Sequence, residues 1–94
     1  MTKTSQIPKL YETEDTPLEQ KIIHQKWHIP NIGFYWLIAE IDEDEAFGYA
    51  NLNDDTMAEW GYIDISDIKS NGAVLDQNFT PKKFPDAKIE CSKE

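Results

Sequence analysis

The middle of the chain has the clearest strand patterns of hydrophobic and polar positions. Residues 33–41 are apolar on both sides of the alternation, which is typical of a central strand covered on both faces. Residues 46–52 and 59–65 alternate as two further strands, after charged turns at 42–45 and 53–55. Because consecutive strands joined by short turns pair antiparallel, this stretch predicts a meander.

Weaker patterns flank the meander. Residues 21–29 alternate well enough for another strand, with Ile23 and Trp27 on the same face. After residue 73 the pattern offers one short extended segment, and Pro81 and Pro85 indicate a loop. We therefore expect an irregular N-terminal arm over 1–17, a single β-rich domain over 18–86 and a frayed C-terminal tail over 87–94.

One short helix follows the third strand of the meander. Asp64 or Ser66 can cap its first turn, and Gly72 stands just past Asn71, where a helix can end in a left-handed residue. The predicted fold class is therefore α+β, mainly β: a three- to four-stranded antiparallel meander with one short helix after the third strand.

Two glycines lie inside the predicted strands. Gly48 suggests a bulge or a close backbone approach. We interpret Glu59–Trp60–Gly61–Tyr62 as a structural signature, in which Gly61 would let a neighbouring backbone or aromatic ring approach closely.

Charge limits the possible partners. The 94-residue chain has a net charge of −9 and a pI near 4.5, and all nine basic residues are lysine. Such a surface repels nucleic-acid phosphates and anionic lipids, so we expect no direct nucleic-acid binding, no membrane binding and a partner with a basic surface. The absence of arginine argues further against nucleotide or DNA recognition, although an A+T-rich genome would produce the same composition.

Cysteine usage and the length of the apolar runs bear on the compartment. The only cysteine, Cys91, cannot form an intramolecular disulfide, which fits a reducing cytosol. Residues 1–9 lack the apolar centre of a signal peptide. The longest apolar run, 32–39, has eight residues, whereas a helix that spans a bilayer needs about 20. We expect a soluble, cytoplasmic protein.

Carboxylates are the most prominent chemical feature. Ten of them lie within the 28 residues 40–67, and no lysine or arginine occurs between Lys26 and Lys69. The two turns of a meander fall at opposite ends of its middle strand, so the ten cannot form one compact site. They form either a solvated surface or a ridge that imitates phosphates and binds a basic protein. The candidate partner-binding residues are Asp42, Glu43, Asp44, Glu45, Asp54, Asp55, Glu59, Trp60 and Tyr62.

Calcium binding is a third interpretation of the carboxylates. Asp42 and Asp44 are spaced as at the start of an EF-hand loop, but Phe47 replaces its glycine and Asn53 its terminal glutamate. No nucleophile elbow, phosphate loop, dinucleotide fingerprint or paired-cysteine zinc motif is present in the sequence. We therefore predict no catalytic residue, no metal ligand and no cofactor.

The histidines do not suggest a metal site. His24 and His28 would lie about 13 Å apart on a strand, too far to share one ion. Cys91 could join them only through a long return of the tail. Both are expected to be ordinary surface or half-buried histidines.

The three tryptophans, Trp27, Trp36 and Trp60, favour packing in the core and on the sheet faces. If two of them were exposed beside Tyr62, they would indicate a groove for a peptide or another protein.

Three segments of the meander together resemble a family. They are Trp36–Asp42 (WLIAEID), Ala46–Gly48 (AFG) and Glu59–Ile63 (EWGYI), followed by a short helix with Ile68. The chain resembles the microbial family catalogued as domain of unknown function 2958, whose small members are often carried by plasmids, phages and integrative elements.

The resemblance covers about residues 18–86, including the segment Pro81–Phe84. Members usually have an aliphatic residue in place of Trp60 and more basic residues. The resemblance implies the same fold and transfers no functional residue. The mobile-element context that it implies favours a counter-defence or regulatory role.

The sequence favours a small non-enzymatic interaction module that acts on another protein, in its sharpest form as a nucleic-acid-mimicking inhibitor. That form predicts that the 42–45 turn and Glu59 lie along one ridge. The alternative is a small metal- or ligand-binding protein, or an enzyme with a carboxylate/His site, which predicts a concave pocket with a strongly perturbed carboxylate, or His24 or His28, at its wall. Pairing of an exposed sheet edge would give a homodimer, so we expect a monomer or a weak homodimer.

Overall fold

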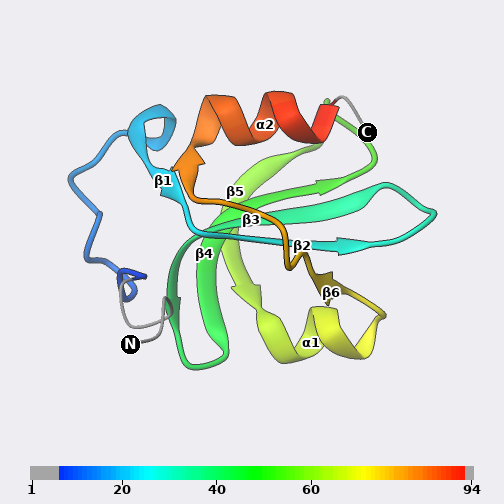
Figure 1. The fold of residues 1–94 in the computed structure, drawn as a ribbon. Coiled ribbons are helices and arrows are strands. Elements are labelled where there is room, and N and C mark those ends of the chain that lie inside the picture. The colour runs from blue at the N-terminus through cyan, green and yellow to red at the C-terminus, as the bar shows by residue number, and fades with distance from the viewer. Residues whose placement is uncertain (1–6, 93–94) are drawn as a thin grey trace.

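The computed structural model describes residues 7–92 and shows two antiparallel sheets and two α-helices (Figure 1). The larger sheet has five strands in the order β5-β4-β3-β2-β6, and β1 and β7 form a separate two-stranded sheet. The elements are a 3₁₀ turn (Leu18–Gln20), β1 (Ile22–Ile23), β2 (Gln25–Ile29), β3 (Phe34–Asp42), β4 (Glu45–Leu52), β5 (Glu59–Asp64), α1 (Ile65–Ser70), β6 (Val74–Leu75), β7 (Lys82–Lys83) and α2 (Phe84–Ser92). The mainly β, α+β fold class is confirmed, whereas the predicted three or four strands are too few.

Strands β3, β4 and β5 form the predicted antiparallel meander. Its register shifts between Ile38 and Glu40, so that Ala39 is the extra residue of a bulge. Gly48 lies opposite this point, and a Cβ atom on it would stand 2.1 Å from the carbonyl oxygen of Leu37. Only glycine fits there, as the sequence pattern predicted.

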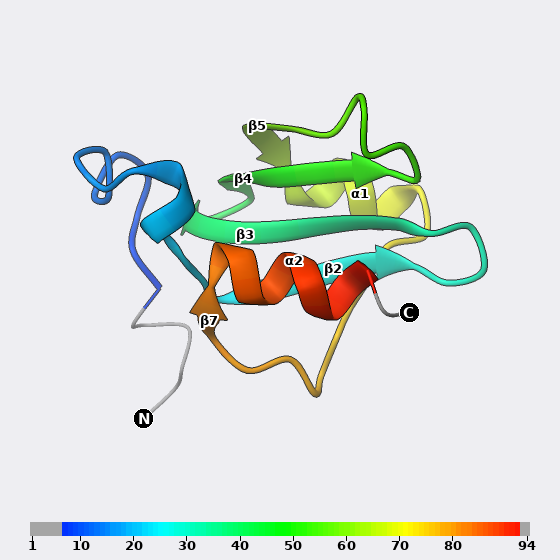
Figure 2. The same ribbon diagram turned by 90° about the horizontal axis from the view of Figure 1, so that it is seen from above.

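The two faces of the sheet bury separate cores, and α1 and α2 lie on opposite sides (Figures 1 and 2). This arrangement explains why β3 is apolar on both faces. The core under α1 contains Trp27, Trp36, Ile38, Ala46, Ile63, Ile65, Ile68 and Ala73. The core under α2 contains Ile23, Leu37, Ala39, Tyr49, Phe84 and Ala87.

Helix α1 begins and ends as predicted. The Asp64 carboxylate accepts hydrogen bonds from the backbone N of Asp67 (3.2 Å) and from Ser66 Oγ (2.8 Å), which caps the first turn. After the helix, Gly72 adopts a φ of +103°, a left-handed conformation that favours glycine.

The C-terminal region differs most from its prediction. Residues 84–92 form a helix instead of a loop and a frayed tail, and 93–94 lie outside the described residues. Pro85 stands in the first turn, where a helix needs no backbone N–H, so it does not oppose the helix. Phe84 and Ala87 are buried against the sheet and Cys91 packs beside them. The predicted loop at Lys82–Lys83 is also wrong, because it pairs with β1.

Two predictions within the strands are wrong. Residues 21–29 do not form one regular strand: His24 N donates to Ile38 O (2.8 Å), and Gln25 is also paired with Ile38. His24 is thus an extra residue opposite Ile38, and it reverses the alternation of side chains along the segment. Ile23 and Trp27 therefore belong to the cores on opposite faces. Apart from Gly61 itself and its two chain neighbours, no atom lies within 4 Å of the position of a Cβ on Gly61, so no close approach requires glycine there.

Part of the predicted arm has a defined place. Residues 1–6 lie outside the described residues, whereas 7–20 run along the same end of the sheet as the turn between β3 and β4. The carbonyl oxygen of Pro8 accepts a hydrogen bond from Ile41 N (2.9 Å). We refer to residues 7–20 as the arm.

Candidate functional site

Five carboxylates gather where β3 turns into β4, and we name them the acidic end. Asp42 is paired with Glu45, and Glu45 is paired with Asp64, so three carboxylates stand side by side on adjacent strands. Directly opposite residues share a face of the sheet, here the face that carries α2. The acidic end comprises Asp42, Glu43, Asp44, Glu45 and Asp64, all of them exposed.

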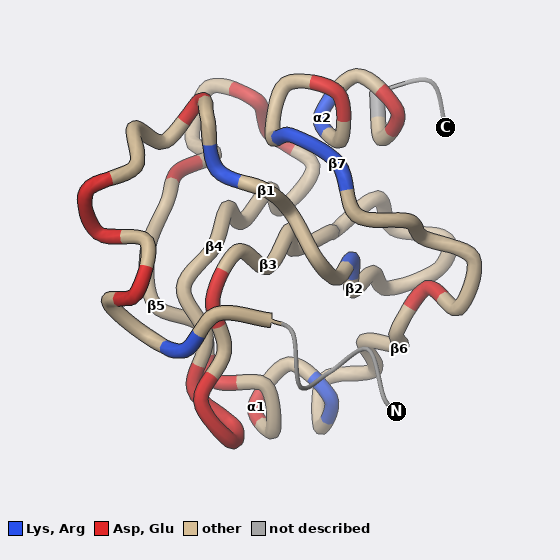
Figure 3. The backbone as a smooth tube through the Cα atoms, turned by 60° about the vertical axis from the view of Figure 1, so that its left-hand side comes forward, with Lys and Arg blue, Asp and Glu red and all other residues tan. Residues whose placement is uncertain are grey.

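The arm adds negative charge near the acidic end. It carries four exposed carboxylates, at positions 12, 14, 15 and 19, and Lys9 is the only basic residue within 7–20. In Figure 3 the acidic stretches of the arm and of the β3–β4 turn lie along the left side of the molecule. A broad part of the surface is therefore negative, with the acidic end at its lower corner in that view.

The remaining candidate carboxylates lie at the other end of the sheet. Asp54 and Asp55 follow β4, and Glu59 is paired with Ala50 at the start of β5. Glu59 is five residues from Asp64, about 17 Å along the strand, and lies on the opposite face from Asp64. The structure therefore does not form the single ridge from the 42–45 turn to Glu59 that the charge-mimic hypothesis predicted.

Trp60 and Tyr62 differ in accessibility although both project from the same face of β5. Trp60 is half-buried and packs against Phe47 (ring centroids 5.6 Å apart) and against Phe84 of α2 (4.9 Å). Tyr62 is 57% exposed and contacts Phe47 edge to face at 5.4 Å. Trp60 is thus a packing residue, whereas Tyr62 leaves much of its aromatic ring exposed to solvent.

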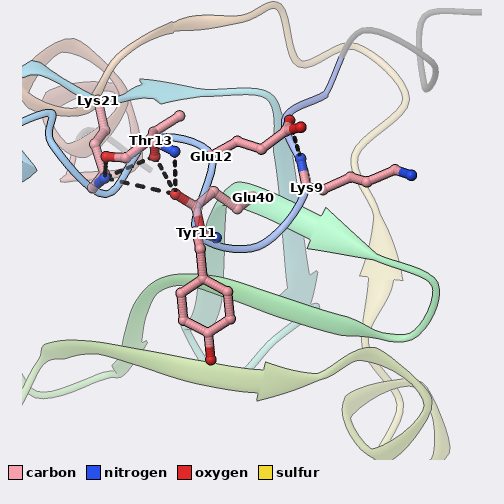
Figure 4. Close-up of polar contacts among 6 residues, drawn as sticks. All are labelled: Lys9, Tyr11, Glu12, Thr13, Lys21 and Glu40. Carbon is pink, nitrogen blue, oxygen red and sulfur yellow. Dashed lines mark hydrogen bonds and ion pairs between the residues drawn. The ribbon is translucent and has the colours of Figure 1, made fainter.

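Glu40 is buried and holds the arm in place (Figure 4). One carboxylate oxygen accepts a hydrogen bond from Tyr11 N (2.8 Å), and the other accepts from Thr13 N (3.1 Å) and from the Thr13 hydroxyl. Lys21 Nζ lies 3.8 Å from the same carboxylate and donates to the Thr13 carbonyl and to Thr13 Oγ1 (2.8 Å). These contacts connect β3 to two backbone amides of the arm.

The environment of Glu40 keeps it ionised. Burial alone would raise its pKa, but the hydrogen bonds from Thr13 and Tyr11 and the charge of Lys21 outweigh burial and lower it. The side chains of Glu40 and Lys21 are only 5% and 4% exposed. Sequence analysis grouped Glu40 with the surface carboxylates and missed this pair. The one feature of the sequence that indicated a buried Glu40 was its position inside a strand that is otherwise apolar on both faces.

A pocket of about 390 Å³ lies between the arm and the sheet. Its aromatic surfaces come from Tyr11 of the arm, Phe47 of β4 and Tyr62 of β5, and Tyr11 and Tyr62 lie with their ring centroids 6.3 Å apart. Figure 4 shows the Tyr11 ring pointing from the arm toward the strands of the sheet. We name this cavity the arm pocket.

A second pocket, of about 460 Å³, lies at the opposite end of the sheet. His28, Tyr35, Asn51, Asp55 and Cys91 are among its lining residues. The Asn51 side chain donates to Tyr35 Oη (3.2 Å) and to Asp55 Oδ1 (2.7 Å), which fixes the pocket wall. Burial, together with the nearby Cys91, raises the pKa of Tyr35 to about 12, although the Asn51 hydrogen bond acts in the opposite direction.

Helix α2 makes the return of the tail that sequence analysis judged necessary for Cys91 to approach a histidine. Cys91 and His28 line the second pocket together, whereas His24 lies outside it, where burial lowers its pKa. Within residues 7–92, no three His, Cys, Asp or Glu side chains are placed to share a metal ion.

Comparison of the chain with protein-family models, curated proteins and solved structures gave no match. Among the described residues, no helix is both long and apolar enough to cross a membrane. The candidate site therefore depends on the geometry of this chain alone.

Proposed function

We propose that the protein is a small acidic interaction module that binds a protein with a basic surface. The observation that supports it best is the row of Asp42, Glu45 and Asp64 on three adjacent strands. Neighbouring strands lie about 4.8 Å apart, so the row concentrates negative charge in a line, as the phosphates of a nucleic-acid strand do. Such a surface attracts basic grooves and suppresses acidic partners.

Inhibition of a nucleic-acid-handling protein by charge mimicry is the narrower form of this proposal. The acidic end and the acidic arm support it, while Glu59, Asp54 and Asp55 lie apart from them. The resemblance to domain of unknown function 2958 supports a mobile-element origin. We further propose that the protein acts in the cytoplasm as a monomer or weak homodimer, without binding nucleic acid or membranes directly.

Recovery of the tagged protein from its native host tests the proposal. A basic protein should co-purify at low salt and dissociate at high salt, because contacts between exposed charges are screened. The variant D42N/D44N/E45Q should lose most of this partner. The matched variant D54N/D55N/E59Q removes the same number of carboxylates at the other end of the sheet and should retain it. Equal retention by both variants would contradict a role for the acidic end.

A small-ligand-binding protein or an enzyme with a carboxylate/His site is the second candidate. The second pocket supports it, because a histidine, His28, and a carboxylate, Asp55, both line it. Mass spectrometry of small molecules that co-purify with the protein tests this candidate. A compound retained by the wild type and lost from His28→Ala would support it, and recovery of no small molecule would count against it.

A further inference from the structure

The arm pocket combines exposed aromatic rings with an acidic surrounding. Tyr11 is 61% and Tyr62 57% exposed, although they come from segments 51 positions apart in the chain. Phe47 forms the floor beside Tyr62, with ring centroids 5.4 Å apart at an angle of 63°. Aromatic faces carry negative electrostatic potential, so adjoining rings at several angles suit a cation better than an anion.

Charges at the pocket favour the same kind of ligand. Lys21 and Glu40 are paired with each other, which leaves Glu14 as the exposed charged group in the lining. Glu45 of the acidic end also acts electrostatically on Tyr62. A side-chain hydrogen bond with Tyr11 raises the pKa of Tyr62, and burial and the charges of Glu40 and Glu45 raise it further. The phenol of Tyr62 therefore stays neutral at physiological pH.

One ring of the pocket already accepts a cation from within the chain. Lys21 Nζ lies 5.8 Å from the centroid of the Phe47 ring, a distance at which an ammonium group is attracted by an aromatic face. The rings of Tyr11 and Tyr62 have no such partner among the cation–aromatic contacts of the described residues.

The backbone of the arm is held in an unfavourable conformation that presents the Tyr11 ring. Tyr11 has a φ of +72°, a left-handed conformation that is uncommon for a bulky residue. Its backbone N–H donates to Glu40, whose burial fixes the position of the arm. Strained residues of this kind persist where the surrounding structure imposes them, frequently at binding sites.

We propose that the arm pocket receives the cationic side chain, lysine or arginine, of the basic protein that the acidic end binds. This inference rests on the proposed function and adds a specific anchor to it. Tyr11 and Tyr62 would contact the cation directly, Glu14 would attract it from the rim, and Glu40 would act as a positioning residue for Tyr11. The methylene groups of the entering side chain would pack against the rings.

Titration with a short oligolysine peptide, acetylated and amidated at its ends, tests the inference. Binding is measured by calorimetry and by NMR shifts of the Tyr11, Phe47 and Tyr62 amides, at low and at physiological salt. Tyr62→Ala should weaken binding by roughly three- to thirtyfold, the range expected for a lost cation–aromatic contact. Tyr62→Phe keeps the ring and should stay within about twofold of the wild type. Leu52→Ala alters an exposed apolar residue of β4 and should change nothing.

The outcomes separate this inference from the proposed function. If Tyr62→Ala and Tyr11→Ala both bind the peptide as the wild type does, while D42N/D44N/E45Q binds it more weakly, the arm pocket is not the anchor and the acidic end remains. If the peptide fails to bind, or if D42N/D44N/E45Q binds it unchanged, the proposed function fails as well. Because Tyr62 and Tyr11 are mostly exposed, both alanine variants should fold, and circular dichroism checks this.

Discussion

The two faces of the central sheet differ in the kinds of side chain that they bury. The face under α1 is filled by apolar side chains such as Trp36, Ile38 and Ile63, with Ile65 and Ile68 of the helix closing it. The face under α2 and the arm also buries charged and polar groups, namely Lys21, Lys26, Glu40 and Asn51. Both pockets described above open on this second face.

Buried charges cost free energy unless they are paired and hydrogen-bonded, so their concentration on one face needs a reason. Glu40 and Lys21 are satisfied by each other and by Thr13, and they fix the arm that carries Tyr11. Both faces therefore stabilise the fold. The polar face, under α2, in addition positions the arm and the candidate binding surface, whereas the apolar face, under α1, contributes its core alone. The following substitutions test these contributions.

Loss of Glu40 should have the largest effect. Glu40→Ala leaves the ammonium group of Lys21 buried without its carboxylate and removes the acceptor for Tyr11 N and Thr13 N. We expect a loss of about 3–5 kcal/mol in the free energy of unfolding, measured by urea denaturation. Asp15→Ala changes an exposed carboxylate of the arm and should cost less than about 0.5 kcal/mol. Equal effects of the two variants would show that the buried pair does not hold the structure.

A cavity in the core of the apolar face should lower the free energy of unfolding by a comparable but somewhat smaller amount. Ile38 is fully buried in the core under α1, and Ile38→Ala should cost about 2–4 kcal/mol. Unlike Glu40→Ala, it should leave the arm no more sensitive to limited proteolysis than the core, because the arm contacts the other face. Val74→Ala, at a half-exposed position, is the control. Selective cleavage of the arm in Ile38→Ala would contradict the separation of the faces.

Low pH should reduce the contribution of the polar face to stability, because Glu40 titrates there. The pKa of Glu40 is lower in the folded protein than in the unfolded chain, where a glutamate has a value of about 4.3. Its stabilising contribution is therefore complete above that value and is lost as the pH falls through the folded pKa. Between pH 7 and pH 3, the unfolding free energy of the wild type should fall more steeply than that of Glu40→Gln. Parallel pH profiles would mean that Glu40 does not contribute.

Substitutions of Asp64 should have the smallest effect on stability, and they separate its role as a helix cap from the role of its charge. Asp64→Ala removes the cap of α1 and should lower the thermal midpoint by about 4–8 °C. Asp64→Asn keeps a capping oxygen and should retain most of the stability while weakening the binding of a basic partner. If Asp64→Asn binds the partner unchanged, Asp64 acts only as a helix cap.

The parts of the fold that alternation determines were predictable. Strands β3, β4 and β5, the Asp64 cap and the irregularity opposite Gly48 each have a local signal in the sequence. Helix α2 was missed because Pro81 and Pro85 were interpreted as loop residues, although the spacing of Phe84, Ala87 and Cys91 fits one helical face. The two-residue strands β6 and β7 are too short to show any period.

The candidate site was only half predictable for a related reason. The 42–45 turn and Tyr62 were identified because charge and aromatic residues stand out locally. The burial of Glu40 and its contacts with Thr13 and Tyr11 depend on chain segments that meet only in the folded protein. The division of the carboxylates between two ends and two faces likewise depends on the register of β5.

Zero-length carbodiimide crosslinking of the protein to the partner recovered from its host tests the central claim most directly. This reaction joins a carboxylate to a lysine in direct contact with it, and mass spectrometry identifies both residues. We predict crosslinks from the acidic end, Asp42 to Glu45, and from Glu14 at the arm pocket. Crosslinks confined to Asp54, Asp55 and Glu59 would place the partner at the other end of the sheet and contradict the account.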